Sequence, residues 1–443
     1  MRKLIATILV TTFLSVQTYA AETKFTVNPT TVRTQLLSGN ISLLQSLNNV
    51  QNSKLNVSMA RAKLLPSLNL GVLLPALANP TFLLSSVTIL FPFLVPSNWL
   101  VLKQEKELFE ADKASYKAIQ LNVLSNALSL YYTLINDQKV HQVYLDQSAV
   151  LERVYKTLKK QSDILGNVTT EDLNMALAQW EESKIRVSKI DELLIEERAA
   201  LRASLALPLG TELMMEEKDL PASEFETRPI GEIAQRSLDI APESVQLNSL
   251  VKAAKAGKMA KIFGFMSSSS IAGTSSNNAS PFEGLKAGGG FSIGADTLVN
   301  IKIANNNIDS LLLRVEQFKE ENEKVAEVLS GKLIEVKEQQ ELSQSAFNAR
   351  MKVFEGQRRQ YELGLISLQT LLQTESQLTD IKVNQIKADL DLKMQRLTLQ
   401  RLVIDGDFSL VKGCSADSLP KDMEKKGIFH RKKSMSLDEL CKQ

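Results

Sequence analysis

Three long stretches of this sequence contain neither glycine nor proline. They run from Ser97 to Leu165, from Asn167 to Leu207 and from Leu365 to Asp405. Because glycine and proline most often interrupt regular structure, their absence predicts uninterrupted helices. At 1.5 Å per residue, a helix of about 63 residues is already roughly 95 Å long, and globular domains seldom contain helices of that length. Helices of this length need a packing partner along most of their surface.

Apolar residues recur at near-heptad spacing along these stretches, which is typical of long helices packed side by side. Before the first interruption the series is Val143, Val150, Val154, Leu158 and Leu165. Gly166 and Gly364 can take the left-handed conformation that ends a helix, and Thr169 and Ser367 can cap the helix that follows. Each glycine is therefore predicted to lie at the tip of an antiparallel helical hairpin.

Equivalent helix-breaking residues in the two halves of the sequence are separated by a constant number of residues. Three pairs of helix-breaking residues are each 198 residues apart: Pro66 and Gly264, Gly166 and Gly364, Pro208 and Gly406. A fixed offset predicts a duplication. We expect a first repeat over residues 21–229 with its tip at 166, and a second repeat over residues 230–405 with its tip at 364.

Each predicted repeat also contains a stretch with the alternating pattern of β-strands. We predict strands at 67–74 and 81–92 in the first repeat, and at 262–275 and 288–298 in the second. A membrane-spanning helix at 67–92 would carry Pro75 and Pro80 in its interior, at a cost of about 3 kcal/mol each. Strands of about ten residues can cross a bilayer, although a soluble β-hairpin would show the same periodicity.

Four strands from one chain cannot close a barrel, and lipid tolerates no open sheet edge. If the strands span a membrane, several copies of the chain must therefore combine. Three copies would supply twelve strands, which close into a barrel too wide for side chains to fill. The predicted fold is mainly α with a small β part, and the predicted assembly is a trimeric channel.

The two ends of the chain differ from the repeats. Residues 1–20 resemble a signal peptide, with Arg2 and Lys3 before an apolar run and small residues before the expected cleavage site, so we expect export. Residues 406–443 form a charged tail, which we interpret as mostly solvated. Cys414 and Cys441 could form a disulfide in an oxidising compartment, whereas no zinc-binding spacing is present. A formal net charge of +2 predicts no nucleic-acid partner.

Several local patterns resemble the TolC family of outer-membrane efflux proteins. They are the segment ending Ala-Lys-Leu-Leu-Pro before the first predicted strand, its counterpart ending Met-Ala-Lys-Ile-Phe, and two glycine-centred tips in register. The resemblance covers about Val32 to Val403. It implies a trimer with a twelve-stranded barrel in the outer membrane and a helical tunnel through the periplasm. Long periplasmic helices of this kind would come from both repeats.

The resemblance also implies which residues meet a partner. In this family the tips contact a periplasmic adaptor protein, which links the channel to an inner-membrane transporter. Carried over by position, the adaptor-binding residues are Gly166, Val168, Thr169, Gly364, Leu365, Ile366 and Ser367. The periplasmic constriction would be formed by Tyr361, Gln369, Thr370 and Gln373. Thr370 and Gln373 stand where some members carry aspartate, so a carboxylate ring is not expected there.

The sequence contains no catalytic motif or cofactor-binding pattern, and its two histidines, His141 and His430, are far apart. We therefore expect that the protein is not an enzyme and binds no cofactor. The predicted function is passive conduction, as the outer-membrane component of a tripartite efflux or type I secretion system. The alternative is a soluble periplasmic coiled-coil protein with a structural or adaptor role.

Overall fold

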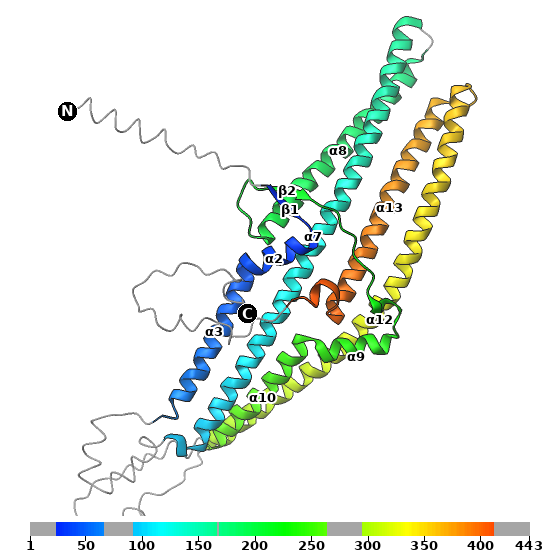
Figure 1. The fold of residues 1–443 in the computed structure, drawn as a ribbon. Coiled ribbons are helices and arrows are strands. Elements are labelled where there is room, and N and C mark those ends of the chain that lie inside the picture. The colour runs from blue at the N-terminus through cyan, green and yellow to red at the C-terminus, as the bar shows by residue number, and fades with distance from the viewer. Residues whose placement is uncertain (1–23, 66–91, 166–167, 264–294, 412–443) are drawn as a thin grey trace, which may run out of the picture. The chain divides into compact units, whose positions relative to one another are not determined.

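The computed structural model describes residues 24–65, 92–165, 168–263 and 295–411. These residues are mostly helical, and the longest elements are four helices that form two hairpins (Figure 1). The helices are α2 (Pro29–Gly39), α3 (Ile41–Ala62), α7 (Pro96–Leu165), α8 (Thr170–Ser204), α9 (Ile230–Ile240), α10 (Pro242–Ile262), α12 (Ala295–Glu362) and α13 (Leu368–Val403). Two short strands, β1 (Lys24–Val27) and β2 (Glu212–Met215), and short 3-10 turns complete the described part.

The long helices follow the glycine-free and proline-free stretches closely. Helix α7 has 70 residues and α12 has 68, so each would be about 100–105 Å long if straight. The order of a helix of about 20 residues, a very long helix and a helix of about 35 residues occurs twice along the chain, first as α3, α7 and α8, then as α10, α12 and α13. The mainly helical fold predicted from the sequence is confirmed.

Parts of the predicted strands are wrong. Pro92 begins a 3-10 turn, Ile262 is the last residue of α10, and residues 295–298 belong to α12. Residues 295–330, which begin α12, contain no glycine or proline, a composition that favours an uninterrupted helix. The remaining strand predictions, at 67–74, 81–91, 264–275 and 288–294, lie outside the described residues, as do the signal peptide and both cysteines.

The chain divides into two compact units, which we describe separately. The first comprises Met1–Leu36, Leu124–Pro221 and Leu333–Leu397. It contains the parallel pair of β1 and β2, in which Lys24 is opposite Glu212 and Val27 is opposite Met215. The pair brings the start of the described chain to the segment that follows α8.

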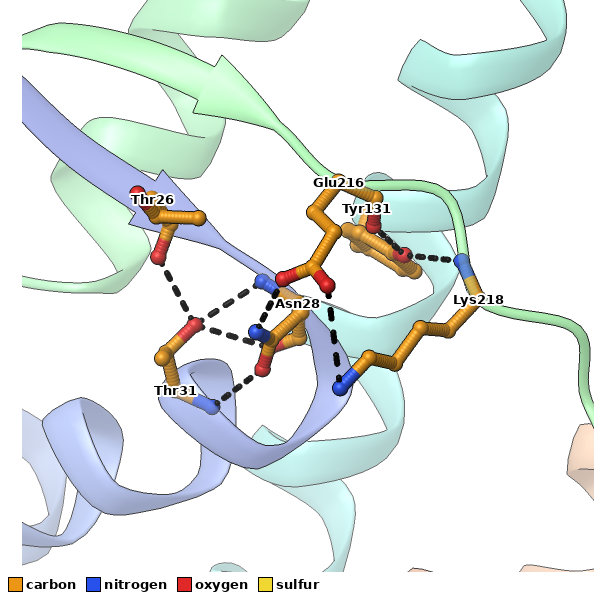
Figure 2. Close-up of polar contacts among 6 residues, drawn as sticks. All are labelled: Thr26, Asn28, Thr31, Tyr131, Glu216 and Lys218. Carbon is orange, nitrogen blue, oxygen red and sulfur yellow. Dashed lines mark hydrogen bonds and ion pairs between the residues drawn. The ribbon is translucent and has the colours of Figure 1, made fainter.

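A hydrogen-bond network closes this junction (Figure 2). The Asn28 side chain accepts from the Thr31 backbone N–H at 2.9 Å, which caps the start of α2, and donates to the Glu216 carboxylate at 2.7 Å. The buried Tyr131 of α7 donates its hydroxyl proton to the Glu216 carbonyl at 2.6 Å and accepts from the Lys218 N–H at 3.0 Å. One tyrosine thus holds the segment after β2 against the long helix.

Below the tips, the four long helices of the first unit pack through alternating apolar and polar levels. The apolar cluster nearest the tips contains Leu151, Leu158, Ala176, Leu368 and Leu372, and we call it the tip cluster. A second apolar cluster contains Val140, Val143, Ile190 and Val383. Polar side chains that are buried between the helices lie between and beyond these clusters, and they are described with the site below.

The second unit comprises Leu37–Val123, Ala222–Lys332 and Thr398–Gln443. Val57 and Ala60 of α3 pack with Leu102 of α7 in an apolar cluster. The guanidinium of Arg401 donates to the Asn122 side chain at 2.8 Å and to the Glu243 carboxylate at 2.6 Å. These contacts tie the end of α13 to α7 and to the start of α10.

Within the described residues, none of the helices combines the length and apolar character needed to span a membrane.

Candidate functional site: the two hairpin tips

The second tip is a complete helix-ending motif. Gly364 has a φ of +71°, the left-handed conformation that the sequence predicts for it. The Gly364 N–H donates to the Tyr361 carbonyl and the Leu365 N–H donates to the Gln360 carbonyl, each at 2.9 Å. These two bonds define a Schellman motif, which satisfies carbonyls at the end of α12 that would otherwise lack partners.

The helix that follows this tip starts with a side-chain cap. The Ser367 hydroxyl accepts from the Thr370 N–H at 3.2 Å and lies 3.0 Å from the Thr370 hydroxyl. Ser367 is therefore the N-cap of α13, as predicted. Thr370, which the family resemblance places in the constriction, takes part in this cap.

The first tip is capped in the same way, although Gly166 and Asn167 lie outside the described residues. The Thr169 hydroxyl accepts from the Asp172 N–H at 3.0 Å and donates to the Asp172 carboxylate at 2.7 Å. Thr169 has extended backbone angles and α8 begins at the next residue, which confirms it as the N-cap. The acidic residues Glu171 and Asp172 in the first turn also complement the positive end of the helix.

The tip cluster joins the two hairpins. Val168 of the first tip and Tyr361 of α12 both pack against it, although they are far apart in sequence. Burial, and then the negative charge of Asp172, raise the pKa of the Tyr361 hydroxyl. Tyr361 therefore stays uncharged at neutral pH, and it packs against the same apolar cluster as Val168 of the first tip.

The other proposed constriction residues lie differently. Gln369 and Gln373 are exposed and four residues apart, so they share one face of α13. Neither side chain is part of the tip cluster. The structure thus brings Tyr361 together with the core of the hairpins and leaves the two glutamines on a surface.

Apolar side chains at the tips are unusually exposed. Ile164, Leu363 and Leu365 are 79%, 73% and 70% exposed, respectively. Of these, only Leu365 is named by the family resemblance. Ile164 and Leu363 lie next to the glycine turns in sequence, and neither fits the apolar stripe that packs against the neighbouring helix. Exposed apolar side chains of this size are often part of a contact surface for another molecule.

A buried polar network below the tip cluster was not predicted. The Gln147 side chain of α7 donates to the Glu375 carboxylate of α13 at 3.0 Å, and the Thr379 hydroxyl donates to the same carboxylate at 3.2 Å. All three side chains are buried. Burial raises the pKa of Glu375, and the two hydrogen bonds offset part of this rise.

A second buried carboxyl lies between α7 and α8. Glu197 is 9% exposed, and its carboxyl group is hydrogen bonded to Asp137. Burial first, and then the hydrogen bond and negative charge of Asp137, raise the pKa of Glu197 to about 8. At neutral pH Glu197 is therefore protonated and can donate to the Asp137 carboxylate. In sequence it cannot be distinguished from the many solvated acids of α8.

Two further observations concern metal ligation and the surroundings of His141 in the described part of the chain. Within the described ranges, no group of three or more His, Cys, Asp and Glu side chains is placed to hold a metal ion. His141 lies 2.9 Å from the Asp191 carboxylate, which gives this histidine a partner on the neighbouring helix.

No protein-family model matches this sequence, and no curated protein sequence matches it. Solved structures do match the fold. CusC, in structures that describe transmembrane channel formation, superposes with a TM-score of 0.65 and 15% identity, over 88% of this chain and 96% of that chain. The open-state outer membrane channel MtrE of Neisseria gonorrhoeae has a TM-score of 0.63 and 13% identity, over 85% and 89% of the two chains.

The CmeC outer membrane channel of Campylobacter jejuni is similar as well, with a TM-score of 0.61 and 13% identity, over 88% of this chain and 90% of that chain. These identities are low, but each match spans most of both chains. They therefore report a shared architecture rather than isolated helical segments. The chain has the fold of the TolC-like outer-membrane channels, as its sequence indicates.

Proposed function

We propose that this chain is the outer-membrane channel component of a tripartite efflux or type I secretion system. Three copies form a water-filled passage that conducts substrates passively to the exterior. An inner-membrane transporter supplies the energy, and a periplasmic adaptor connects it to the channel. The observation that carries the proposal is the fold shared with outer-membrane channels over most of the chain.

Exposed apolar residues along the long helices support association with further copies. Ile185 and Ile195 on α8, and Ile334 and Leu342 on α12, are all more than half exposed in the single chain. A helix that stayed in contact with water would seldom present so many large apolar side chains. We propose that neighbouring subunits of a homotrimer cover these side chains. The four predicted strands of each of the three copies would together form a twelve-stranded barrel in the outer membrane.

The tips fit the adaptor contact in this proposal. The helix after each tip begins with a side-chain cap, and Ile164, Leu363 and Leu365 near the tips have exposed apolar side chains. An adaptor with a complementary apolar face would bury these side chains. Opening of the passage requires the two hairpins to shift against each other below the tips. Long helices can slide by small steps while the apolar packing between them is kept.

Membrane fractionation tests the proposal against the soluble-rod alternative. The full chain, expressed with its N-terminal segment in a Gram-negative host, is expected in the outer-membrane fraction, and washing with carbonate should not release it. Chemical crosslinking of that fraction should give a species three times the mass of one chain. A monomer recovered in the periplasmic soluble fraction would favour the soluble coiled-coil role and contradict the channel.

A further inference from the structure

The two hairpins meet where α7 packs against α13, and a carboxyl group is buried in this contact. Two hydrogen bonds join the helices directly: Gln147 donates to Glu375 at 3.0 Å, and the Ser129 hydroxyl donates to the Met394 sulfur at 3.1 Å. On α13, Glu375 lies between a leucine of the tip cluster and a valine of the second apolar cluster. An ionisable side chain is therefore placed between two apolar levels that hold the hairpins together.

The hydrogen-bonding partners of Glu375 are neutral. Its side chain is 8% exposed, and its carboxyl oxygens accept from the Gln147 amide and, at 3.2 Å, from the Thr379 hydroxyl. Hydrogen bonds from neutral donors satisfy the oxygens but do not neutralise a charge. A buried carboxylate without an opposite charge in contact costs free energy, so the ionised form of Glu375 disfavours the packed arrangement.

The nearby cation is shared with another acid. Arg186 of α8 and Asp380 of α13 are the charged groups of the described residues whose fields act on Glu375, and they lie 3.7 Å apart as an ion pair. Tyr144 of α7 lies close to the same pair and stays uncharged, because burial raises its pKa. Burial therefore raises the pKa of Glu375, and the two hydrogen bonds and Arg186 offset only part of this rise.

The Gln147 amide can bind either form of the carboxyl group. Its N–H group donates to Glu375 in the described orientation, and its Oε1 atom is buried without a donor among the described residues. If the amide turns by half a rotation, Oε1 can accept from the O–H of a protonated Glu375. The hydrogen bond between the hairpins therefore does not require the negative charge.

We propose that Glu375 is a proton-sensitive contact between the two hairpins: a bound proton favours their close packing, and loss of the proton favours their separation at this level. This inference rests on the proposed function, because it assigns the separation to opening of the passage. Water reaches the carboxylate when the hairpins separate, so the cost of burying its charge disappears. Acidification should therefore close the passage, and a rising pH should open it.

The pH range follows from the burial of the carboxyl group. In the separated form Glu375 should have its ordinary pKa of 4.5, whereas the packed form has a raised pKa. The proton therefore stabilises the packed form fully below about pH 4.5, and this stabilisation is lost as the pH rises through the raised pKa.

Single-channel recording of the full chain from about pH 4 to about pH 9 tests the inference. The open probability of the wild type should rise with pH by about fivefold or more, the lower end of usual coupling between two sites. Glu375→Gln cannot ionise and keeps both hydrogen-bonding atoms, so it should stay mostly closed and lose this rise. Both proteins retain Glu197, so the difference between them reports Glu375 alone.

The matched control is Glu355→Gln, which makes the same change at an exposed glutamate of α12 about equally far from Gly364 along the chain. Its open probability should stay within about twofold of the wild type at each pH. Loss of the pH dependence in both variants would indicate a general effect of charge and overturn the assignment to Glu375. A wild type that opens on acidification, or a Glu375→Gln variant with the wild-type profile, would also overturn it.

Hydrogen exchange of the full chain in detergent provides a second readout that does not need conduction. After correction for the intrinsic effect of pH, amides of α13 around Glu375 should exchange faster as the pH rises in the wild type, and not in Glu375→Gln. This pattern in a protein that forms no pore would contradict the channel but support the proton-sensitive contact. A conducting protein whose exchange around Glu375 does not change with pH would leave the channel standing and overturn the inference, even if the variant failed to fold.

Discussion

The tip cluster and the Asp137–Glu197 pair lie in the same unit, but the cluster joins the two hairpins, whereas the pair joins α7 and α8 within the first hairpin. The tip cluster consists of apolar side chains, so its contribution to stability does not depend on pH. The Asp137–Glu197 pair stabilises the contact between α7 and α8 only while Glu197 keeps its proton. The apolar cluster therefore holds the two hairpins together at any pH, whereas the carboxyl pair makes the packing of α7 on α8 depend on pH.

The largest effect is expected from the tip cluster. Leu372→Ala removes a side chain that is 4% exposed and should lower the free energy of unfolding by about 2–5 kcal/mol, because it leaves a cavity between α13 and α7. Urea denaturation followed by circular dichroism measures the loss. Leu365→Ala is the matched control, since its exposed side chain should change stability by less than about 0.5 kcal/mol. Equal effects would show that the cluster does not hold the hairpins.

The Asp137–Glu197 pair should make stability depend on pH. The folded pKa of Glu197, about 8, is above its ordinary value of 4.5, so its stabilisation is complete below about pH 4.5 and is lost as the pH rises through about 8. Relative to wild type, Glu197→Gln should be more stable at pH 9 than at pH 6, by roughly 2–3 kcal/mol. Thermal denaturation at both values measures this difference. A difference that does not change with pH would contradict the protonated pair.

Two glycines of the second hairpin should respond in opposite directions to replacement by alanine. Gly364→Ala forces a Cβ into a left-handed conformation and should cost about 1 kcal/mol. Gly356 lies inside α12 with open space around its Cα, so Gly356→Ala should stabilise the helix by about 0.5–1 kcal/mol. Midpoints of chemical denaturation report both changes. Stabilisation by both substitutions would show that the turn at 364 is not left-handed.

The smallest effect concerns the cap of the first tip. Thr169→Ala removes the hydrogen bond to the Asp172 N–H and should cost about 0.5–1 kcal/mol at this exposed position. Thr169→Ser keeps a hydroxyl and serves as the control, with a cost of only a few tenths of a kcal/mol. Hydrogen exchange of the first turn of α8 should accelerate only in the alanine variant. Acceleration in both would assign the effect to the lost methyl group rather than to the cap.

The long helices and the geometry of the second tip could be predicted from the sequence because they depend on local residue types. Gly364 adopts the predicted left-handed conformation and Ser367 the predicted cap, since both follow from backbone sterics and nearest-neighbour hydrogen bonds. The start of α12 was missed. The residues just before and at its start, from Phe291 to Ala295, alternate between apolar and small side chains in the sequence, a pattern that predicts a strand.

The buried polar levels could not be predicted, because a heptad pattern identifies which residues face a partner helix but not what they meet there. Glu375 and Gln147 come from different hairpins, and their contact depends on how α13 packs against α7. Glu197 has the same local pattern as its solvated neighbours Glu192 and Glu196, which are exposed. Only tertiary packing separates these carboxyl groups.

Single-channel recording in planar lipid bilayers shows whether the chain forms a conduit. Purified wild-type protein and Leu368→Ala, which weakens the tip cluster, are compared after insertion from detergent. We expect discrete ion-conducting steps, with a higher open probability in the variant because its tips hold together less firmly. If both proteins insert into the bilayer and neither conducts, the chain is not a channel.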